Sequence, residues 1–319
     1  MLPGRVLLVR NPRARRAPSE GALRQVSTPL LGRGWRIVIR STTRAGEAAH
    51  IAAEAAAEGY NAVVAVGGDG TVHELAQGLT GTSTALGVLP AGTANIWATE
   101  AGVPGKTSRA TGFLARARSV PVDVGRVTFD DGTARRFLLM CSVGLDAEVV
   151  RRIGGGGVRK RIFGRAAYIG AGLGRLVRAT PTLTGIEVDG VYAEHDLYVA
   201  VVGNTRLYGG ITELTSAALA DDGQLDVATF SARRFAGRRL PGRLALAARA
   251  LRGQLDERQR GGVDYQRGAQ VRIAPVTRLP VQADGEYIGE TPVTITVEPR
   301  ALHVLLDPDP NPLLTGEVE

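Results

Sequence analysis

The pattern of strands changes once along the chain, near Val127, and this change limits the fold more than any other feature. Before it, short β-branched runs alternate with helical stretches: RVLLVRNP, WRIVIRST, the Ala-rich stretch from Gly46 to Gly59, and NAVVAV. Such alternation predicts a parallel sheet with crossover helices. After it, strand-like runs recur around Asp-Gly turns, which are strong hairpin signals. We therefore expect an α/β domain with a parallel sheet, followed by an antiparallel β-sandwich domain.

Length and charge set further limits. A chain of 319 residues is long enough for two domains. The formal net charge of +8 attracts anions, which include nucleotides, nucleic acid and acidic lipid surfaces. Aromatic residues make up only 5% of the chain and no nucleic-acid-binding module is recognised, so no nucleic-acid partner is expected. The N-terminus has too short an apolar run for a signal peptide, and no apolar stretch reaches the length of a membrane span, so we expect a cytoplasmic protein.

Cysteine and histidine offer little metal chemistry. The single cysteine, Cys141, lies in the apolar run FLLMCSVGL, which predicts a role in core packing. The four histidines are scattered without the spacing of zinc ligands. Any metal that this protein binds is expected to have oxygen ligands.

The strand NAVVAV ends in a glycine turn, Gly67 to Thr71, and a helix with a periodic apolar face begins at once. A glycine turn at a helix N-terminus predicts a phosphate site, because unpaired N–H groups and the helix dipole both point at the loop. Asp69 would repel phosphate unless a cation lay between them, which favours Mg²⁺. Thr71 and Glu74 have the spacing of a capping box, and this structural role is the expectation for Glu74.

A second glycine turn follows the strand TALGVLP, where Gly92, Thr93 and Asn95 lead into a helix that begins near Ile96. Ligands of open α/β sheets bind in the crevice at the carboxyl ends of the strands. The segment RNPRAR after the first strand and Thr42 after the second end at the same edge. Four loops are therefore expected to converge on one nucleotide.

The chain contains five Asp-Gly pairs, and most pairs of this kind are simple turns. Asp131 and Asp189 are interpreted as such turns. Asp284 differs because Glu286 follows two residues later. If a strand starts at the turn, a period of two puts both carboxylates on one face, where they could accept a proton.

The motifs, in order along the chain, resemble the lipid kinase family that includes diacylglycerol kinases, sphingosine kinases and their bacterial relatives. The resemblance is carried by VVAVGGDGTVHELAQGL, LGVLPAGTANIWA, GLDAEVV, GRAAYIGAGL, LYGGITELTSAALADDGQLDV and VQADGEYIGETPVTITVEPRALHVLLDP. It departs from the family where the glycine that usually ends the first loop is Arg15, and where the Asp that often follows Asn95 is Ile96. The resemblance implies a nucleotide-binding α/β domain over residues 1–125 plus 301–319 and a lipid-substrate β-sandwich over 126–300.

The resemblance also implies an activity and a set of site residues. The expected reaction transfers the γ-phosphoryl group of ATP, as its Mg²⁺ complex, to a lipid hydroxyl, with diacylglycerol giving phosphatidic acid as the leading case. Glu286, Asp284 and Asp69 are the implied catalytic residues, and a structural Mg²⁺ is implied at Asp222 with main-chain oxygens of Leu219 and Gln224. The implied ATP-binding positions are Asn11, Pro12, Arg13, Ala14, Arg15, Thr42, Gly67, Gly68, Asp69, Gly70, Thr71, Val72, His73 and Thr93, to which the second glycine turn adds Gly92 and Asn95.

Two rival functions stay open at this point. An NAD kinase shares GGDGT, but its Asn-Glu pair and its Gly/Thr/Ser-rich motif are not found here. A catalytically silent lipid or nucleotide sensor is favoured by the altered first loop. Two Arg-rich segments, 151–180 and 233–260, are candidates for peripheral docking on an anionic membrane at its inner face, although a solvated Arg face over a buried apolar stripe is the more common interpretation of such segments. A homodimer is left open.

Overall fold

The computed structural model describes residues 4–154, 180–210, 212–232, 263–307 and 311–315. Two compact units divide the chain. The first comprises residues 1–124, 219–222 and 298–319, and the second comprises 125–218 and 223–297. The boundaries cut through two long strands, β5 (Arg118–Phe129) and β17 (Val293–Leu306), each of which contributes to both units.

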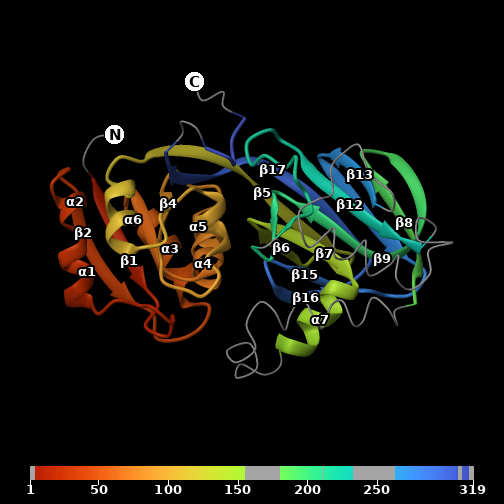
Figure 1. Ribbon diagram of the computed structural model, residues 1–319, viewed down its shortest axis with the longest axis horizontal. Coiled ribbons are helices and arrows are strands. Elements are labelled where there is room, and N and C mark those ends of the chain that lie inside the picture. The colour runs from red at the N-terminus through yellow and green to blue at the C-terminus, as the bar shows by residue number, and fades with distance from the viewer. Residues whose placement is uncertain (1–3, 155–179, 211, 233–262, 308–310, 316–319) are drawn as a thin grey trace. The chain divides into compact units, whose positions relative to one another are not determined.

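The first unit is built on a parallel sheet in the order β2-β1-β3-β4 (Figure 1). Its strands are β1 (Arg5–Arg10), β2 (Arg36–Ser41), β3 (Ala62–Gly67) and β4 (Ala85–Pro90). Its helices are α1 (Glu20–Val26), α2 (Thr28–Leu31), α3 (Glu47–Ala57), α4 (Asp69–Leu79), α5 (Ile96–Glu100) and α6 (Thr107–Leu114). Every residue of β3 and β4 is buried, as expected for central strands of a parallel sheet that helices cover.

The connections create a switch point in this sheet. The chain runs from β1 to β2 on one side and then returns to β3 on the other side of β1. Helix α3 packs on α4, while α6 packs on α1 and α2. Because the first connection and the later ones run in opposite directions across the sheet, the carboxyl ends of β1 and β3 border the crevice where such folds bind ligands.

Later segments of the chain complete the first unit. The end of β17 runs parallel to β4, with Val304 opposite Leu86. The backbone N–H of Ala220 donates to Leu313 O at 2.7 Å, and that of Asp123 donates to Ala220 O at 2.6 Å. The loop at 219–222 is therefore bonded into the first unit by main-chain hydrogen bonds.

The second unit is an antiparallel sandwich with one described helix, α7 (Leu145–Gly154). The strands follow the order β16-β15-β7-β9-β8-β14-β17, and β12 pairs with both β9 and β13. Their bounds are β6 (Ala134–Phe137), β7 (Met140–Gly144), β8 (Thr182–Val188), β9 (Val191–Gly203), β12 (Leu225–Ser231), β13 (Val263–Gly268), β14 (Gln270–Pro275), β15 (Pro280–Ala283) and β16 (Glu286–Glu290). Two short strands, β10 (Leu207–Tyr208) and β11 (Thr212–Glu213), form a separate pair.

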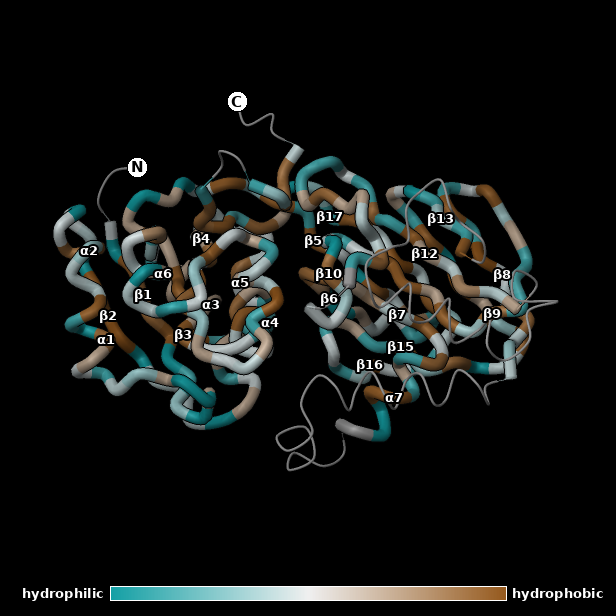
Figure 2. Tube along the Cα trace, in the orientation of Figure 1, coloured by the Kyte–Doolittle hydropathy of each residue, from teal (hydrophilic) through white to brown (hydrophobic). Residues whose placement is uncertain are grey.

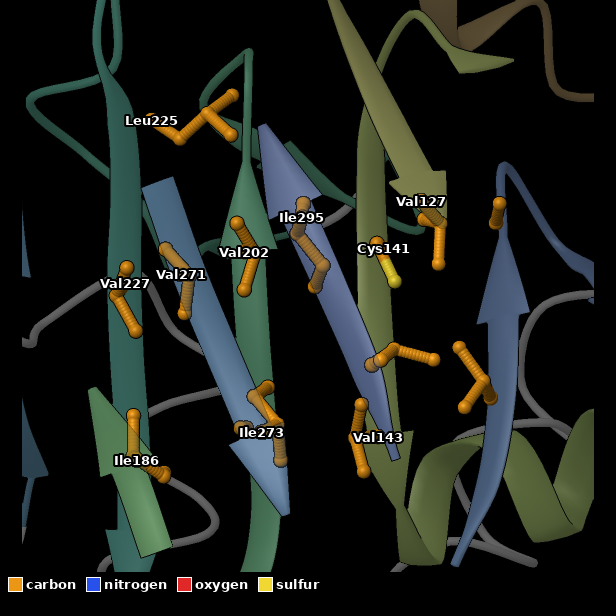
Figure 3. Packing of buried hydrophobic residues seen from close by; sticks show 14 of the residues in the cluster. Val127, Cys141, Val143, Ile186, Val202, Leu225, Val227, Val271, Ile273 and Ile295 are labelled. Atoms are coloured by element: carbon orange, nitrogen blue, oxygen red, sulfur yellow. The ribbon is translucent and has the colours of Figure 1, made fainter. Parts of the chain in front are cut away.

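Apolar side chains from most of these strands meet in one core. Figure 3 shows Val202, Val227, Val271, Ile273 and Ile295 gathered between the strands. Cys141 lies in the same cluster and is fully buried, so its predicted role in packing is confirmed. Figure 2 shows that hydrophobic residues concentrate on the strands of each unit, while the connecting loops are largely hydrophilic. The predicted fold class, a parallel α/β domain followed by an antiparallel sandwich, is confirmed.

Candidate active site

Four loops leave the first sheet at its carboxyl edge, and hydrogen bonds fix where each begins. Thr42 N donates to Arg10 O at 2.9 Å and Asn11 N donates to Val66 O at 3.0 Å. Ala91 N donates to Gly67 O at 2.8 Å. The sheet thus places the ends of β1, β2, β3 and β4 side by side, and the loops predicted to share a ligand do start from neighbouring strands.

The two glycine turns touch through their backbones. A Cβ atom added to Gly92 would lie 2.5 Å from Gly68 Cα, and one added to Gly68 would lie 3.1 Å from Gly92 Cα. Real Cβ atoms avoid such distances, so a side chain at either position would force the turns apart. The turns after β3 and β4 therefore pack main chain against main chain at Gly68 and Gly92.

The first of these turns opens helix α4. Gly68 is the N-cap, so no side chain occupies the helix N-terminus, and Thr71 Oγ1 accepts from Asn11 Nδ2 at 3.0 Å. The predicted capping box is wrong: Glu74 Oε2 instead accepts from Ala48 N on α3 at 3.2 Å. A tertiary partner has replaced the local one. Because no side chain makes a cap hydrogen bond there, the N-terminus of this eleven-residue helix is a favourable place for a phosphate group.

The second turn is closed by Asn95. Its Oδ1 accepts from Gly92 N at 2.9 Å, its Nδ2 donates to Gly92 O at 3.2 Å, and its φ of 51° is left-handed, which Asn tolerates well. Asp69 joins the two turns, because its Oδ1 accepts from Trp97 N in α5 at 3.1 Å. The half-buried Asp69 thus has a structural contact in addition to its expected role towards Mg²⁺.

The first loop folds over its own Asn11. Arg13 N donates to Asn11 Oδ1 at 3.0 Å, Ala14 N donates to Asn11 O at 3.1 Å, and Arg16 N donates to Ala91 O at 2.9 Å. Pro12, Arg13 and Arg15 are exposed. Arg15, in the place of the glycine that usually ends this loop, and Arg13 thus add two cations at the carboxyl edge of the sheet.

The remaining residues expected to bind ATP differ in how exposed their side chains are. Thr42 is buried and Thr93 is exposed. Val72 points into the core, so only its backbone could face a ligand. His73 is half-buried, with its Nε2 3.4 Å from Gln77 Nε2.

The two carboxylates of the Asp-Gly-Glu turn lie in different settings, so the prediction that they share one strand face is wrong. Asp284 is in the turn itself, with a φ of 48°, and β16 begins only at Glu286. Asp284 Oδ2 accepts from Leu138 N at 2.8 Å, and its Oδ1 accepts from Leu139 N at 2.9 Å and Met140 N at 3.1 Å. Glu286 is exposed. Asp284 therefore holds the turn in place, whereas Glu286 keeps an exposed side chain at the start of β16.

The other Asp-Gly pairs also divide by role. Asp131 Oδ1 accepts from Thr133 N at 2.8 Å, and Asp189 lies in a left-handed turn between β8 and β9, so both are turns as predicted. In the loop expected to hold a structural Mg²⁺, Asp221 Oδ1 accepts from Thr315 N at 2.9 Å. The adjacent Asp222 is half-buried and precedes Gly223, whose φ is 71°. A carboxylate with main-chain carbonyls is an all-oxygen set, which suits Mg²⁺.

Within the described parts of the chain, no group of three His, Cys, Asp or Glu side chains could hold a metal, and no helix is long and apolar enough to cross a membrane. The Arg-rich docking segments fall mostly on 155–179 and 233–262, outside the described residues.

A parallel α/β unit with two packed glycine turns, followed by a β-sandwich that carries an Asp-Gly-Glu turn, defines the class of two-domain kinases. The model of the diacylglycerol kinase catalytic domain matches residues 5–127, and the model of the YegS C-terminal NAD kinase beta sandwich-like domain matches 140–306. The chain belongs to the lipid kinase family that includes diacylglycerol kinases and YegS-like lipid kinases.

Individual relatives agree. A probable lipid kinase YegS-like of Pseudomonas syringae is 34% identical over 294 residues, covering 89% of this chain and 88% of the relative. A diacylglycerol kinase of Mycobacterium tuberculosis is 32% identical over 305 residues, covering 95% of each chain. Among solved structures, that of a diacylglycerol kinase described as putative, from Bacillus anthracis, has a TM-score of 0.75 and 25% identity, covering 96% of this chain and 98% of its own. The protein is thus a kinase of this family.

Proposed function

We propose that this kinase transfers the γ-phosphoryl group of ATP to the free hydroxyl of diacylglycerol, giving phosphatidic acid and ADP. The observation that supports it most is the backbone contact between the two glycine turns, Gly68 and Gly92, at the switch point of the parallel sheet. Neither glycine carries a side chain at this contact, so polyphosphate oxygens can approach the N–H groups closely. The names of relatives such as the Mycobacterium tuberculosis protein support diacylglycerol as the acceptor.

The proposed roles divide between the loops and the Asp-Gly-Glu turn. The first loop (Asn11 to Arg15), Thr42, the turn from Gly67 to His73 and the turn from Gly92 to Asn95 hold the nucleotide. When bound with ATP, Mg²⁺ neutralises charge on the phosphates, and Asp69 supplies an oxygen on its side of the loop. The expected structural Mg²⁺ would be held by Asp222 with main-chain oxygens of Leu219 and Gln224.

Glu286 is proposed as the proton acceptor. It takes the proton from the lipid hydroxyl, whose oxygen attacks the γ-phosphorus as the bond to the β-phosphate oxygen breaks and ADP leaves. Since positioning and charge neutralisation dominate phosphoryl transfer, the protein needs little covalent chemistry of its own. The acceptor is a membrane lipid, so the protein is proposed to act peripherally at the inner, anionic face of the membrane.

The test is transfer of ³²P from labelled ATP into vesicles carrying diacylglycerol, sphingosine, monoacylglycerol or an isoprenoid alcohol, with NAD as a separate acceptor. Labelled phosphatidic acid is expected to dominate. Labelled NADP would replace the proposal with NAD kinase activity, and no transfer to any acceptor would favour a silent sensor.

Glu286→Gln is expected to lower kcat by about 10²- to 10⁴-fold with little change in the KM for ATP. Glu290→Gln is the matched control, because it makes the same change on the same strand, at a residue whose partner is Arg151 at 3.3 Å. A Glu286→Gln rate within threefold of the control would remove Glu286 from the mechanism.

A further inference from the structure

A buried carboxylate in the second unit lies outside the roles assigned so far. Asp146 comes from the segment GLDAEVV, lies in the first turn of α7 and is only 8% exposed. Its Oδ2 accepts from Ser142 Oγ at 2.5 Å and from Gln282 Nε2 at 3.1 Å, and its Oδ1 accepts from the Tyr208 hydroxyl. Buried charges need such bonds, and the helix N-terminus adds favourable dipoles.

Three separate segments converge on this carboxylate. Ser142 lies on β7, Tyr208 on β10 and Gln282 on β15. The last of these segments continues directly into the Asp-Gly-Glu turn. Asp146 therefore ties the base of that turn to the strand β7 beside it and to the short strand β10.

The carboxylate also decides which way the Gln282 amide points. An ionised carboxylate only accepts hydrogen bonds, so the Gln282 NH₂ group must face Asp146, where it also donates to Ser142 Oγ at 2.8 Å. The amide oxygen is then directed to the other side, where it accepts from Gly285 N at 2.8 Å. Reversing the amide would set its NH₂ group against the Gly285 N–H.

Gly285 is the middle of the turn that ends in Glu286. Its φ of 82° favours glycine, and the preceding Asp284 is anchored by the N–H groups of residues 138–140. The turn is thus held from two sides, by Asp284 through the N–H groups of residues 138–140 and by Gln282 through Asp146. Glu286 itself is exposed and depends on this turn for its position.

We propose that Asp146 is a positioning residue, which fixes the orientation of the Gln282 amide and through it the Gly285 turn that presents Glu286. This inference rests on the proposed function, in which Glu286 accepts the proton. Asp146 touches no reacting atom in this role.

The experiment compares Asp146→Ala and Gln282→Met with the wild-type full chain. Asp146→Ala removes the acceptor that orients the amide, and Gln282→Met keeps the length of the side chain but loses both of its hydrogen-bonding groups. Amide hydrogen exchange at Gly285 is expected to speed up by about tenfold or more in both variants, because the bond that protects it is weakened or lost. A shift of about 1 Å in Glu286 can cost about 10²-fold, so kcat should fall by at least tenfold while the KM for ATP stays within twofold.

Asp226→Ala is the matched control. Asp226 on β12 is likewise a buried carboxylate of the second unit, and it accepts from the hydroxyl of Tyr265 on β13 at 2.5 Å. Its loss is expected to cost stability but to leave exchange at Gly285 within twofold of wild type. This control separates the specific effect of Asp146 from the general cost of removing a buried charge.

A double-mutant comparison adds a readout that a merely structural role would not move. If Asp146 acts through Glu286, adding Asp146→Ala to the Glu286→Gln variant should lower kcat by less than threefold relative to Glu286→Gln alone. The proposal would be overturned if the double variant lost a further tenfold in kcat. It would also be overturned if amide exchange at Gly285 were unchanged in both Asp146→Ala and Gln282→Met. If Asp146→Ala does not fold, Gln282→Met decides on the same criteria. An active Glu286→Gln enzyme would refute the base assignment, whereas the exchange result reports on the turn independently.

Discussion

Replacing Gly92 by Ala tests whether contact between the two glycine turns shapes the nucleotide site. The added Cβ would lie 2.5 Å from Gly68 Cα and 2.8 Å from Asn95 Oδ1. Non-bonded carbon atoms prefer about 3.5–4.0 Å, so the turns must separate by about 1 Å. The closest obstacle is main chain, which cannot rotate away as a side chain could.

The close contact allows the loss of stability and of catalytic efficiency in Gly92→Ala to be estimated. Overpacking of this kind costs about 1–3 kcal/mol, and we expect the upper part of that range because backbone must move. For a domain of 150–250 residues each kcal/mol lowers Tm by about 2–4 °C, so a fall of about 4–12 °C is expected. A shift of about 1 Å between the phosphate loops should also lower kcat/KM for ATP by about 10²-fold.

Thermal unfolding and nucleotide titration measure the two effects. Gly21→Ala in α1 is the control, because nothing lies within 4 Å of the added methyl group, and Ala in place of Gly favours a helix by up to about 1 kcal/mol. Gly21→Ala should match or exceed wild-type stability and keep the same ATP affinity. If Gly92→Ala also keeps both values, contact between the turns does not shape the site.

Three further outcomes follow from the hydrogen bonds and burial. Asp284→Asn should lower the free energy of unfolding, measured in urea, by about 1–3 kcal/mol, because the new NH₂ group would oppose a backbone N–H. Glu286→Gln is expected to keep the wild-type stability. Equal losses in the two variants would contradict the separate roles of these residues. Burial raises the pKa of the Cys141 thiol, and the nearby charges of Asp284 and Asp146 raise it further. Iodoacetamide should therefore label this cysteine only in denaturant. Rapid labelling of the native protein would refute its burial. The N–H and hydroxyl of Thr43 lower the pKa of Glu47 in the folded protein. The stability that Glu47 contributes is therefore complete above the ordinary Glu pKa of about 4.3 and is lost as pH falls through the lower pKa of the folded state. The difference in Tm between wild type and Glu47→Gln should close between pH 6 and pH 3, and a constant difference would refute this role of Thr43.

Much of this protein could be predicted from local sequence patterns. Continuous apolar runs predicted the buried strands β3 and β4, and glycine turns at the starts of α4 and α5 predicted where the loops meet. These patterns succeed because strand burial, helix starts and turns depend on residues a few positions apart. The change from alternating strands and helices to hairpins determined the two architectures in the same way.

The bonds made by individual polar side chains were decided by the tertiary structure. Glu74 has the local spacing of a cap, but its partner is Ala48, 26 residues away. Asp284 accepts from N–H groups 144 to 146 residues earlier in the chain and lies in the turn, so that of the two carboxylates only Glu286 lies on the strand β16.

The partners of the loop at 219–222 and of the buried Asp146 were also decided by the tertiary structure. That loop bonds to Asp123 and Leu313 in the first unit, although its neighbours in sequence belong to the second. The partners of Asp146 include Gln282, 136 residues away. The sequence by itself determined the helices and strands and the loops that we propose bind the nucleotide. Only the folded chain could decide which carboxylates accept hydrogen bonds from the protein and which stay exposed, because a carboxylate bonds to whichever donors the fold brings within about 3 Å of it.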